Sequence, residues 1–163
     1  MFVVFANIGK LELTPHTGYN VVFVMDTSGS LESVHTEDPP TDPNKLRIEG
    51  LGKFLSKLPG SGSRVGLVTF NTHAEAFEKN LRLMQTSDVQ AIYDEVVRKN
   101  EKLGKYTNIT EALHKAADFF TPTKGLDPSL PKLILLFTDG MITLEDSSRV
   151  ADSTFDMRIQ KVL

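Results

Sequence analysis

Residues 19–30 read YNVVFVMDTSGS, an almost unbroken apolar run that ends in an aspartate and a turn of small, mostly hydroxyl-bearing residues. A strand buried on both faces has this composition, as in a parallel sheet that is covered by helices on each side. Two later runs have the same character, RVGLVTF at 64–70 and KLILLFT at 132–138. The three runs predict central strands over 19–25, 64–70 and 132–138.

Segments with helical periodicity separate these predicted strands. Apolar side chains recur at the 3.6-residue spacing of an amphipathic helix in three of them, which cover 44–58 (beginning at Pro43 or Asn44), 88–97 and 108–120. A short run at 75–77 predicts an antiparallel edge strand, and the polar, proline-rich residues 35–44 predict a surface loop. Strands that alternate with helices predict an α/β fold of three layers, doubly wound around a mostly parallel sheet.

The two ends of the chain have weaker patterns. Residues 1–8 (MFVVFANI) are apolar, and they predict an opening strand rather than a signal peptide because no basic residue precedes them. Residues 146–163 predict either one helix or a short helix followed by a strand at 157–163. A chain of 163 residues suits one domain. We therefore expect 1–18 to form an N-terminal strand or extension and 19–163 to form the domain.

The composition argues against several classes of partner and site. The net charge of −3 comes from 18 basic and 21 acidic residues, so no broad cationic surface is available to nucleic acid. The absence of cysteine excludes disulfides and thiolate metal sites. No apolar run approaches the roughly 20 residues that a membrane-spanning helix needs. We expect no nucleic-acid partner and no membrane span in this chain.

Polar residues follow the predicted strands at the edge where open α/β sheets bind ligands. Asp26, Ser28 and Ser30 follow the first strand, the segment 104–107 (GKYT) precedes the third helix, and Asp139 follows the last strand. Each of these also has a structural interpretation, because aspartate and serine are common in turns and Thr107 is well placed to cap a helix.

Taken together, these oxygen donors predict a cation site. Magnesium is a hard cation that prefers oxygen ligands in near-octahedral geometry and keeps several waters. Ser28, Ser30 and Thr107 offer hydroxyl groups, while Asp26 and Asp139 offer negative charge, directly or through water. Neutral ligands leave the cation strongly electrophilic, so it has reason to recruit a carboxylate from a partner. We expect Mg²⁺, with Mn²⁺ or Ca²⁺ as alternatives.

Three motifs in this order resemble the von Willebrand factor A family: a strand with DTSGS at 26–30, a G-x-x-T-x-x-x-x-A-L segment at 104–113, and a strand with TDG at 138–140. The resemblance covers about residue 19 to the C-terminus, and it implies a Rossmann-like fold with a metal-ion-dependent adhesion site. By resemblance, the two serines and Thr107 bind the metal directly, whereas the two aspartates act mostly through waters or as hydrogen-bond acceptors. The open coordination position of such a site takes a Glu or Asp from a protein partner.

Two features depart from the family pattern. The segment 104–107 has one residue more than the usual Gly-Gly-Thr arrangement, which leaves the path of its loop open. Only 24 residues follow Asp139, whereas the family usually continues through a helix, another strand and another helix. We therefore expect a fold that is shortened at its C-terminus, or one completed by residues 1–13, by another chain, or by residues outside this sequence.

The leading functional hypothesis is a cation-dependent protein-binding module for adhesion or interaction, with oligomerisation left open. One alternative is a structural or assembly subunit of a surface or pilus complex. Another is a magnesium-dependent hydrolase with Asp26 as nucleophile, which is weakened by Ser28 where such phosphatases need a second acid. We expect no catalytic residue. The segment DPNKLRIE at 42–49 resembles bacterial or archaeal surface members of the family, which favours an extracytoplasmic location.

Overall fold

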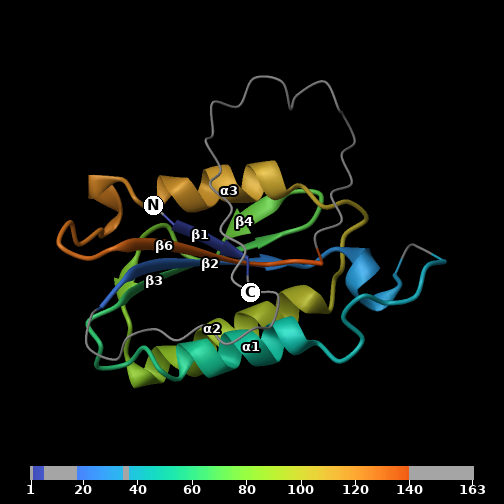
Figure 1. Cartoon of the computed structure of the whole chain (residues 1–163), viewed down its shortest axis with the longest axis horizontal. Helices are drawn as coiled ribbons and strands as arrows, with labels where there is room; N and C mark the ends of the chain where they lie inside the picture. The colour runs from blue at the N-terminus through green and yellow to red at the C-terminus, as the bar shows by residue number, and fades with distance from the viewer. Residues whose placement is uncertain (1, 6–17, 35–36, 140–163) are drawn as a thin grey trace.

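The computed structural model describes residues 2–5, 18–34 and 37–139, and it shows one sheet with helices on both faces (Figure 1). The described elements, in chain order, are β1 (Phe2–Phe5), β2 (Asn20–Asp26), the 3₁₀ helix η1 (Gly29–Glu32), α1 (Leu46–Leu55), β3 (Arg64–Phe70), β4 (Ala74–Ala76), β5 (Arg82–Leu83), α2 (Thr86–Asn100), α3 (Ile109–Asp118), the 3₁₀ helix η2 (Pro122–Lys124) and β6 (Lys132–Phe137).

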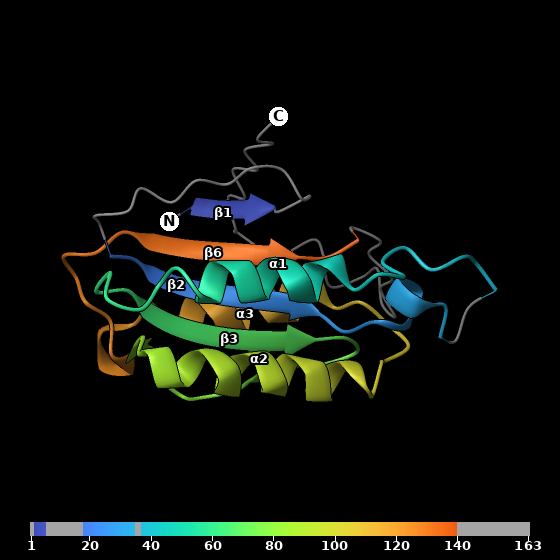
Figure 2. The ribbon, with the colours of Figure 1, turned by 90° about the horizontal axis from the view of Figure 1, so that it is seen from below.

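The strands lie in the order β1-β6-β2-β3-β4, and β5 pairs with a further part of β3. β1, β6, β2 and β3 run parallel to one another, as Figure 2 shows, whereas β4 and β5 are antiparallel to β3. β2 is central: its Phe23 lies opposite Leu67 of β3 and Leu135 of β6. The prediction of a three-layer, mostly parallel α/β fold is confirmed.

The two faces of β2 pack into two separate cores, which explains why its sequence does not alternate between apolar and polar residues. Val22 and Val24 belong to the core beneath α3, which also includes Ala112 and Ala116 of that helix. Phe23 and Met25 belong to the core beneath α1 and α2 on the other face. Figure 1 shows α3 on one side of the sheet and the other two helices together on the opposite side.

All three helices differ from the prediction at their boundaries: α1 ends at Leu55 rather than 58, and α3 covers 109–118 rather than 108–120. α1 begins at Leu46 rather than at 43 or 44, because Lys45 has a left-handed backbone with φ of 53° and cannot belong to a right-handed helix. α2 covers 86–100 rather than 88–97. Its start is fixed by a capping box in which the Gln85 main-chain N–H donates to Asp88 Oδ2 at 2.8 Å.

The edges of the sheet also contain elements that local sequence patterns describe less well. β4 confirms the predicted antiparallel edge strand, shifted by one residue from 75–77, while β5 was not predicted. β1 confirms the predicted opening strand, and it pairs with the outer edge of β6, where Phe2 lies opposite Leu133. The prediction for 146–163 lies outside the described residues, and the division at 18/19 stays a prediction. Within the described part of the chain, the helices are too short or too polar to cross a membrane.

Candidate cation site

The ends of two neighbouring strands bring the acidic residues together. β2 ends at Asp26, and β6 ends at Phe137, two residues before Asp139. Because the strands are parallel and Met25 lies opposite Phe137, both carboxyl ends meet at one edge of the sheet. The helix η1 begins three residues after Asp26 and holds Ser30 at the same edge.

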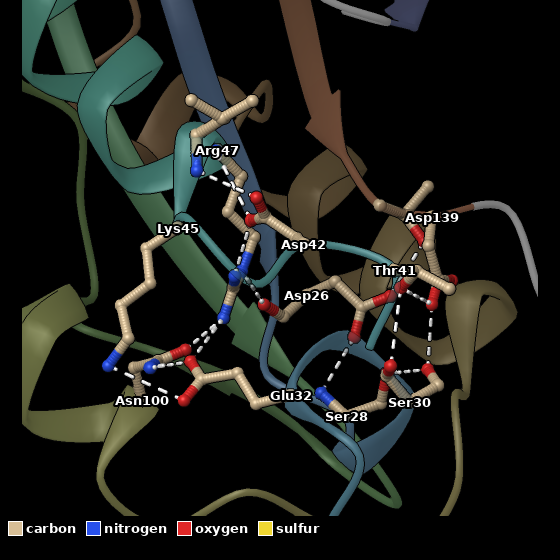
Figure 3. A network of polar contacts seen from close by, with 12 residues as sticks. Asp26, Ser28, Ser30, Glu32, Thr41, Asp42, Lys45, Arg47, Asn100 and Asp139 are labelled. Atoms are coloured by element: carbon tan, nitrogen blue, oxygen red, sulfur yellow. Dashed lines mark hydrogen bonds and ion pairs between the residues drawn. The ribbon is translucent and has the colours of Figure 1, made fainter. Parts of the chain in front are cut away.

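A chain of hydroxyl groups connects these segments (Figure 3). Ser28 Oγ lies 3.2 Å from Ser30 Oγ, and Ser30 Oγ donates to Asp139 Oδ2 at 2.7 Å. A hydroxyl that binds a cation uses an oxygen lone pair, so its proton must point to another acceptor. Asp139 is that acceptor for Ser30, so Ser28 is the donor in the contact between the two serines. One lone pair of Ser30 therefore remains available to a cation.

Asp26 is a buried carboxylate with two well-defined hydrogen bonds. Its Oδ1 accepts from the Ser28 main-chain N–H at 2.8 Å, and its Oδ2 accepts from Thr138 Oγ1 at 2.6 Å. Burial nevertheless raises the pKa of Asp26 above its ordinary value; the hydrogen bonds oppose this rise, and the charge of Asp139 adds to it. Two neighbouring carboxylates, one of them desolvated, form an environment that a bound cation would stabilise.

The third predicted segment runs alongside the first. Ser28 forms an isolated parallel bridge with Gly104. The main-chain N–H of Gly29 donates to Gly104 O at 2.7 Å, and that of Gly104 donates to Thr27 O at 3.0 Å. The extra residue in 104–107 left the path of this loop open in the sequence. In the structure, the loop pairs with the DTSGS segment over a short, strand-like stretch. Thr107, three residues further on, is buried, with 2% of its surface exposed.

The structural role considered for Thr107 belongs instead to its neighbour. Asn108 is the N-cap of α3, and its Oδ1 accepts from the Glu111 main-chain N–H at 3.0 Å. The helix thus starts one residue later than an N-cap at Thr107 would require. A capping role does not account for the buried position of the threonine.

Two glycines allow the loops to approach this closely. A Cβ atom on Gly29 would lie 2.0 Å from the carbonyl oxygen of Val34, and one on Gly104 would lie 2.3 Å from Cγ of Asn71. Neither position has room for a side chain unless the neighbouring segment moves. The glycine of the DTSGS motif is therefore a packing requirement, and it fixes the relative position of Ser28 and Ser30.

Four residues of this region were not predicted as site residues: Thr41, Asp42 and Arg47, which Figure 3 labels, and Thr138. Thr138 belongs to the TDG triplet of the family pattern, in which only Asp139 was given a role in the site. Arg47 is a charged residue four positions before the buried Leu51, on the apolar face of α1. A buried arginine needs several acceptors, so this position was a usable signal.

The donor chemistry fits a hard divalent cation. Within the described ranges, no group of three or more His, Cys, Asp or Glu side chains gathers in a way that could hold a metal. The residues that do converge at the sheet edge are serine hydroxyls and two carboxylates. Magnesium and manganese favour such oxygen donors, whereas soft metals favour sulfur and imidazole.

Comparison with known sequences identifies relatives of this arrangement. Residues 20–160 match the family model of the von Willebrand factor type A domain. The collagen alpha-6(VI) chain of Homo sapiens is 30% identical over 124 residues, which are 74% of this chain and 5% of the collagen chain. The chain therefore spans about a twentieth of the length of that relative.

Solved structures share the fold at lower identity. Proximal thread matrix protein 1 from the mussel byssus has a TM-score of 0.59 and 21% identity, over 80% of this chain and 33% of the thread protein. A form of that protein with a zinc-occupied MIDAS motif has a TM-score of 0.58. An aerotolerance-related membrane protein from Bacteroides fragilis has a TM-score of 0.57 and 20% identity, over 78% of this chain and 57% of that protein.

Proposed function

The chain belongs to the von Willebrand factor type A family, and on this basis we propose that it is a protein-binding module whose divalent cation coordinates an acidic residue of its partner. The observation that supports the proposal most directly is the contact of Ser30 with Asp139, beside the buried Asp26. Residues from two strand ends supply hydroxyl groups and negative charge at one point, which is what a hard cation requires.

Each of five residues has a proposed role. Ser28, Ser30 and Thr107 are direct hydroxyl ligands. Asp26 and Asp139 provide the negative charge and accept the hydrogen bonds that orient those ligands, as the contacts of Asp26 with Ser28 and of Asp139 with Ser30 support. The cation, which we propose to be Mg²⁺ with Mn²⁺ or Ca²⁺ as alternatives, supplies an electrophilic position that a partner's carboxylate fills. We propose no catalytic residue.

The surface around this site would determine which partner binds. We propose that the loop 31–44 and the segment 71–78 form the rim of the site. Val34 of the first segment and Leu46, the first residue of α1, are large apolar residues that are 39% and 41% exposed. Burial of such exposed apolar side chains by a partner would favour association.

The relatives support an extracytoplasmic role. One is a collagen chain and another is a matrix protein of the mussel byssus, and a structure of the latter carries zinc in a MIDAS motif. We propose that this chain likewise works outside the cytoplasm as an adhesion or interaction module.

Isothermal titration with MgCl₂ and with MnCl₂ tests the cation site. We expect the wild type to take up about one cation per chain, and Ser28→Ala to lose that uptake because a direct ligand is removed. Ser129→Ala is the matched control, since its hydroxyl contacts Asp127 in the loop before β6. Absence of uptake by correctly folded wild type, or equal uptake by Ser28→Ala, contradicts the proposal.

A second experiment tests the partner's chemistry. The magnesium-loaded protein is passed over immobilised peptides that contain a glutamate, and over the same peptides with glutamine in its place. We expect capture by the glutamate peptides alone, and release by EDTA. Light scattering with and without magnesium addresses the assembly alternative, because a stable metal-free oligomer would favour a structural subunit.

A further inference from the structure

The rim segment, residues 37–45, is joined by its backbone to the loop that bears the serines. The main-chain N–H of Thr41 donates to Ser30 O at 3.2 Å, and that of Asp42 donates to Leu31 O at 2.9 Å. Thr41 Oγ1 also lies 3.3 Å from Ser30 O. A displacement of η1 would therefore move the rim segment as well.

One side chain of the rim segment reaches the candidate cation site itself. Thr41 Oγ1 donates to Asp139 Oδ2 at 2.8 Å, and Ser30 Oγ donates to the same oxygen at 2.7 Å (Figure 3). Thr41 thus binds the acceptor that orients a proposed ligand, across a sequence separation of 98 residues. Any change in the position of the Asp139 carboxylate alters both contacts.

The other end of the rim segment is held by a buried arginine. Arg47 Nε donates to the main-chain oxygen of Asp26 at 3.1 Å, and one terminal nitrogen donates to Asp42 Oδ2 at 2.5 Å. Its other terminal nitrogen donates to Asn100 of α2, and Asn100 in turn donates to Glu32 Oε1 at 2.5 Å. The planar guanidinium therefore connects the end of β2, the rim segment and α2 in a fixed geometry.

The two ends of the rim segment differ in the contacts that hold them. Around Arg47, two basic side chains (Arg47, Lys45) face two acidic ones (Glu32, Asp42), so the network is balanced in charge, with Arg47 buried and Lys45 exposed. Thr41, by contrast, is exposed, and its side chain contacts the site through one hydroxyl, beside the main-chain bond to Ser30 O. The arginine network is the fixed frame, and Thr41 is the contact that can respond to the state of the site.

We propose that Thr41 is a positioning residue that couples cation occupancy to the order of the rim segment. This inference rests on the proposed function. When a cation binds Ser30 Oγ, the hydrogen bond from Ser30 to Asp139 restrains the Asp139 carboxylate. Thr41 donates to the same carboxylate oxygen and then holds the rim segment in one position. Because coupling between two sites is reciprocal, a partner that binds the ordered rim segment also raises the affinity for the cation.

Magnesium titration of Thr41→Val tests the contact, since valine has nearly the same shape and lacks the hydroxyl. We expect its affinity to fall by about threefold to tenfold, the scale of a lost hydrogen bond to a charged group at a partly exposed position. Thr41→Ser retains a hydroxyl and should stay within about twofold of the wild type. Thr123→Val makes the same change at an exposed threonine of η2 and should have no effect.

Amide hydrogen exchange of residues 37–45 gives the second readout. We expect magnesium to slow exchange in this segment in the wild type and in Thr41→Ser, but not in Thr41→Val. Thermal unfolding of each variant without magnesium verifies that it is folded; should Thr41→Val fail to fold, Thr41→Ala replaces it with the same expectation.

The possible failures are distinguishable. If the wild type takes up no cation, the proposed function fails and the coupling fails with it. If the wild type binds magnesium but Thr41→Val binds it equally well, or still shows slower exchange on addition of magnesium, the role of Thr41 is overturned and the cation site stands.

Discussion

Each end of β2 buries one polar side chain, and the two side chains are of nearly the same size. Their hydrogen-bond partners and their charged surroundings differ in kind. Asn20 and Asp26 both have 0% of their surface exposed. The Asn20 amide donates to the main-chain oxygens of Asp127 and Leu130, at 2.6 and 3.0 Å, and accepts from the Asp127 N–H at 3.0 Å. Asp26 instead accepts from Ser28 and Thr138 and lies near a second carboxylate, that of Asp139.

The difference separates a structural end of the strand from a candidate functional end. Asn20 is neutral, and backbone groups satisfy its amide, so it needs no further ligand. Asp26 has hydrogen bonds to both oxygens, yet burial still raises its pKa above the ordinary value of 3.8. By contrast, hydrogen bonds from Ser129 lower the pKa of Asp127 at the other end. A buried carboxylate of raised pKa is the group that gains most from a cation.

The largest expected effect comes from removing the buried positive charge of Arg47, which contacts the carboxyl end of β2. Arg47→Met leaves Glu32 and Asp42 without their buried partner, and we expect it to lower the free energy of unfolding by about 3–5 kcal/mol. Arg47→Lys keeps the charge but lacks the planar guanidinium, so its free energy of unfolding should lie between those of the wild type and Arg47→Met. Urea denaturation measures both variants, and a loss below about 1 kcal/mol for Arg47→Met would show that the network contributes little to stability.

Loss of the Asn20 amide, at the amino end of β2, should lower the free energy of unfolding by less than Arg47→Met does and leave the cation site intact. Asn20→Ala removes the partner of two carbonyls and one N–H, and we expect a loss of about 2 kcal/mol in the free energy of unfolding. The same urea titration measures it. Magnesium affinity should be unchanged in the folded variant, because the removed contacts lie at the opposite end of β2; a weaker affinity would contradict the separation of the two ends.

Neutralising Asp26, at the carboxyl end of β2, should stabilise the metal-free protein, by less than the two previous substitutions destabilise it. Asp26→Asn retains an oxygen for the Ser28 N–H but removes a buried charge that Asp139 repels. We expect the metal-free variant to melt about 2–4 °C higher than the wild type, which is roughly 1 kcal/mol for a domain of this size, and to lose magnesium uptake. A lower melting temperature would mean that the carboxylate stabilises the fold without a cation.

The smallest effects concern pH. Because the folded-state pKa of Asp26 is raised, its contribution to metal-free stability is present below 3.8 and is lost as the pH rises through the folded value. Magnesium needs the carboxylate, so the increase in melting temperature on adding magnesium should grow over the same pH window, and Asp26→Asn should remove this dependence. A magnesium effect that is constant across the window would contradict the assignment.

Asp127 should show the reverse dependence. Its lowered pKa makes its contribution to stability present above the ordinary value of 3.8 and lost as the pH falls through the folded value. Carboxyl carbon chemical shifts in an NMR titration measure both aspartates, and Ser129→Ala should return the pKa of Asp127 toward 3.8 while leaving that of Asp26 unchanged.

By itself, the sequence determined the parts of the protein that depend on local patterns. Long apolar runs identified β2, β3 and β6, because a strand buried on both faces must be apolar throughout. The rule that polar residues after parallel strands share one edge predicted that Asp26, Ser28, Ser30 and Asp139 would lie close together, as they do.

Only the tertiary structure decided the contacts between segments that are distant in sequence. The pairing of β1 with β6, the contact of Arg47 with Asn100 and the bond from Thr41 to Asp139 leave no periodic signal in the chain. Hydrophobic periodicity records which face of a segment is buried, whereas the partner of a buried polar group depends on which loops the completed sheet brings together.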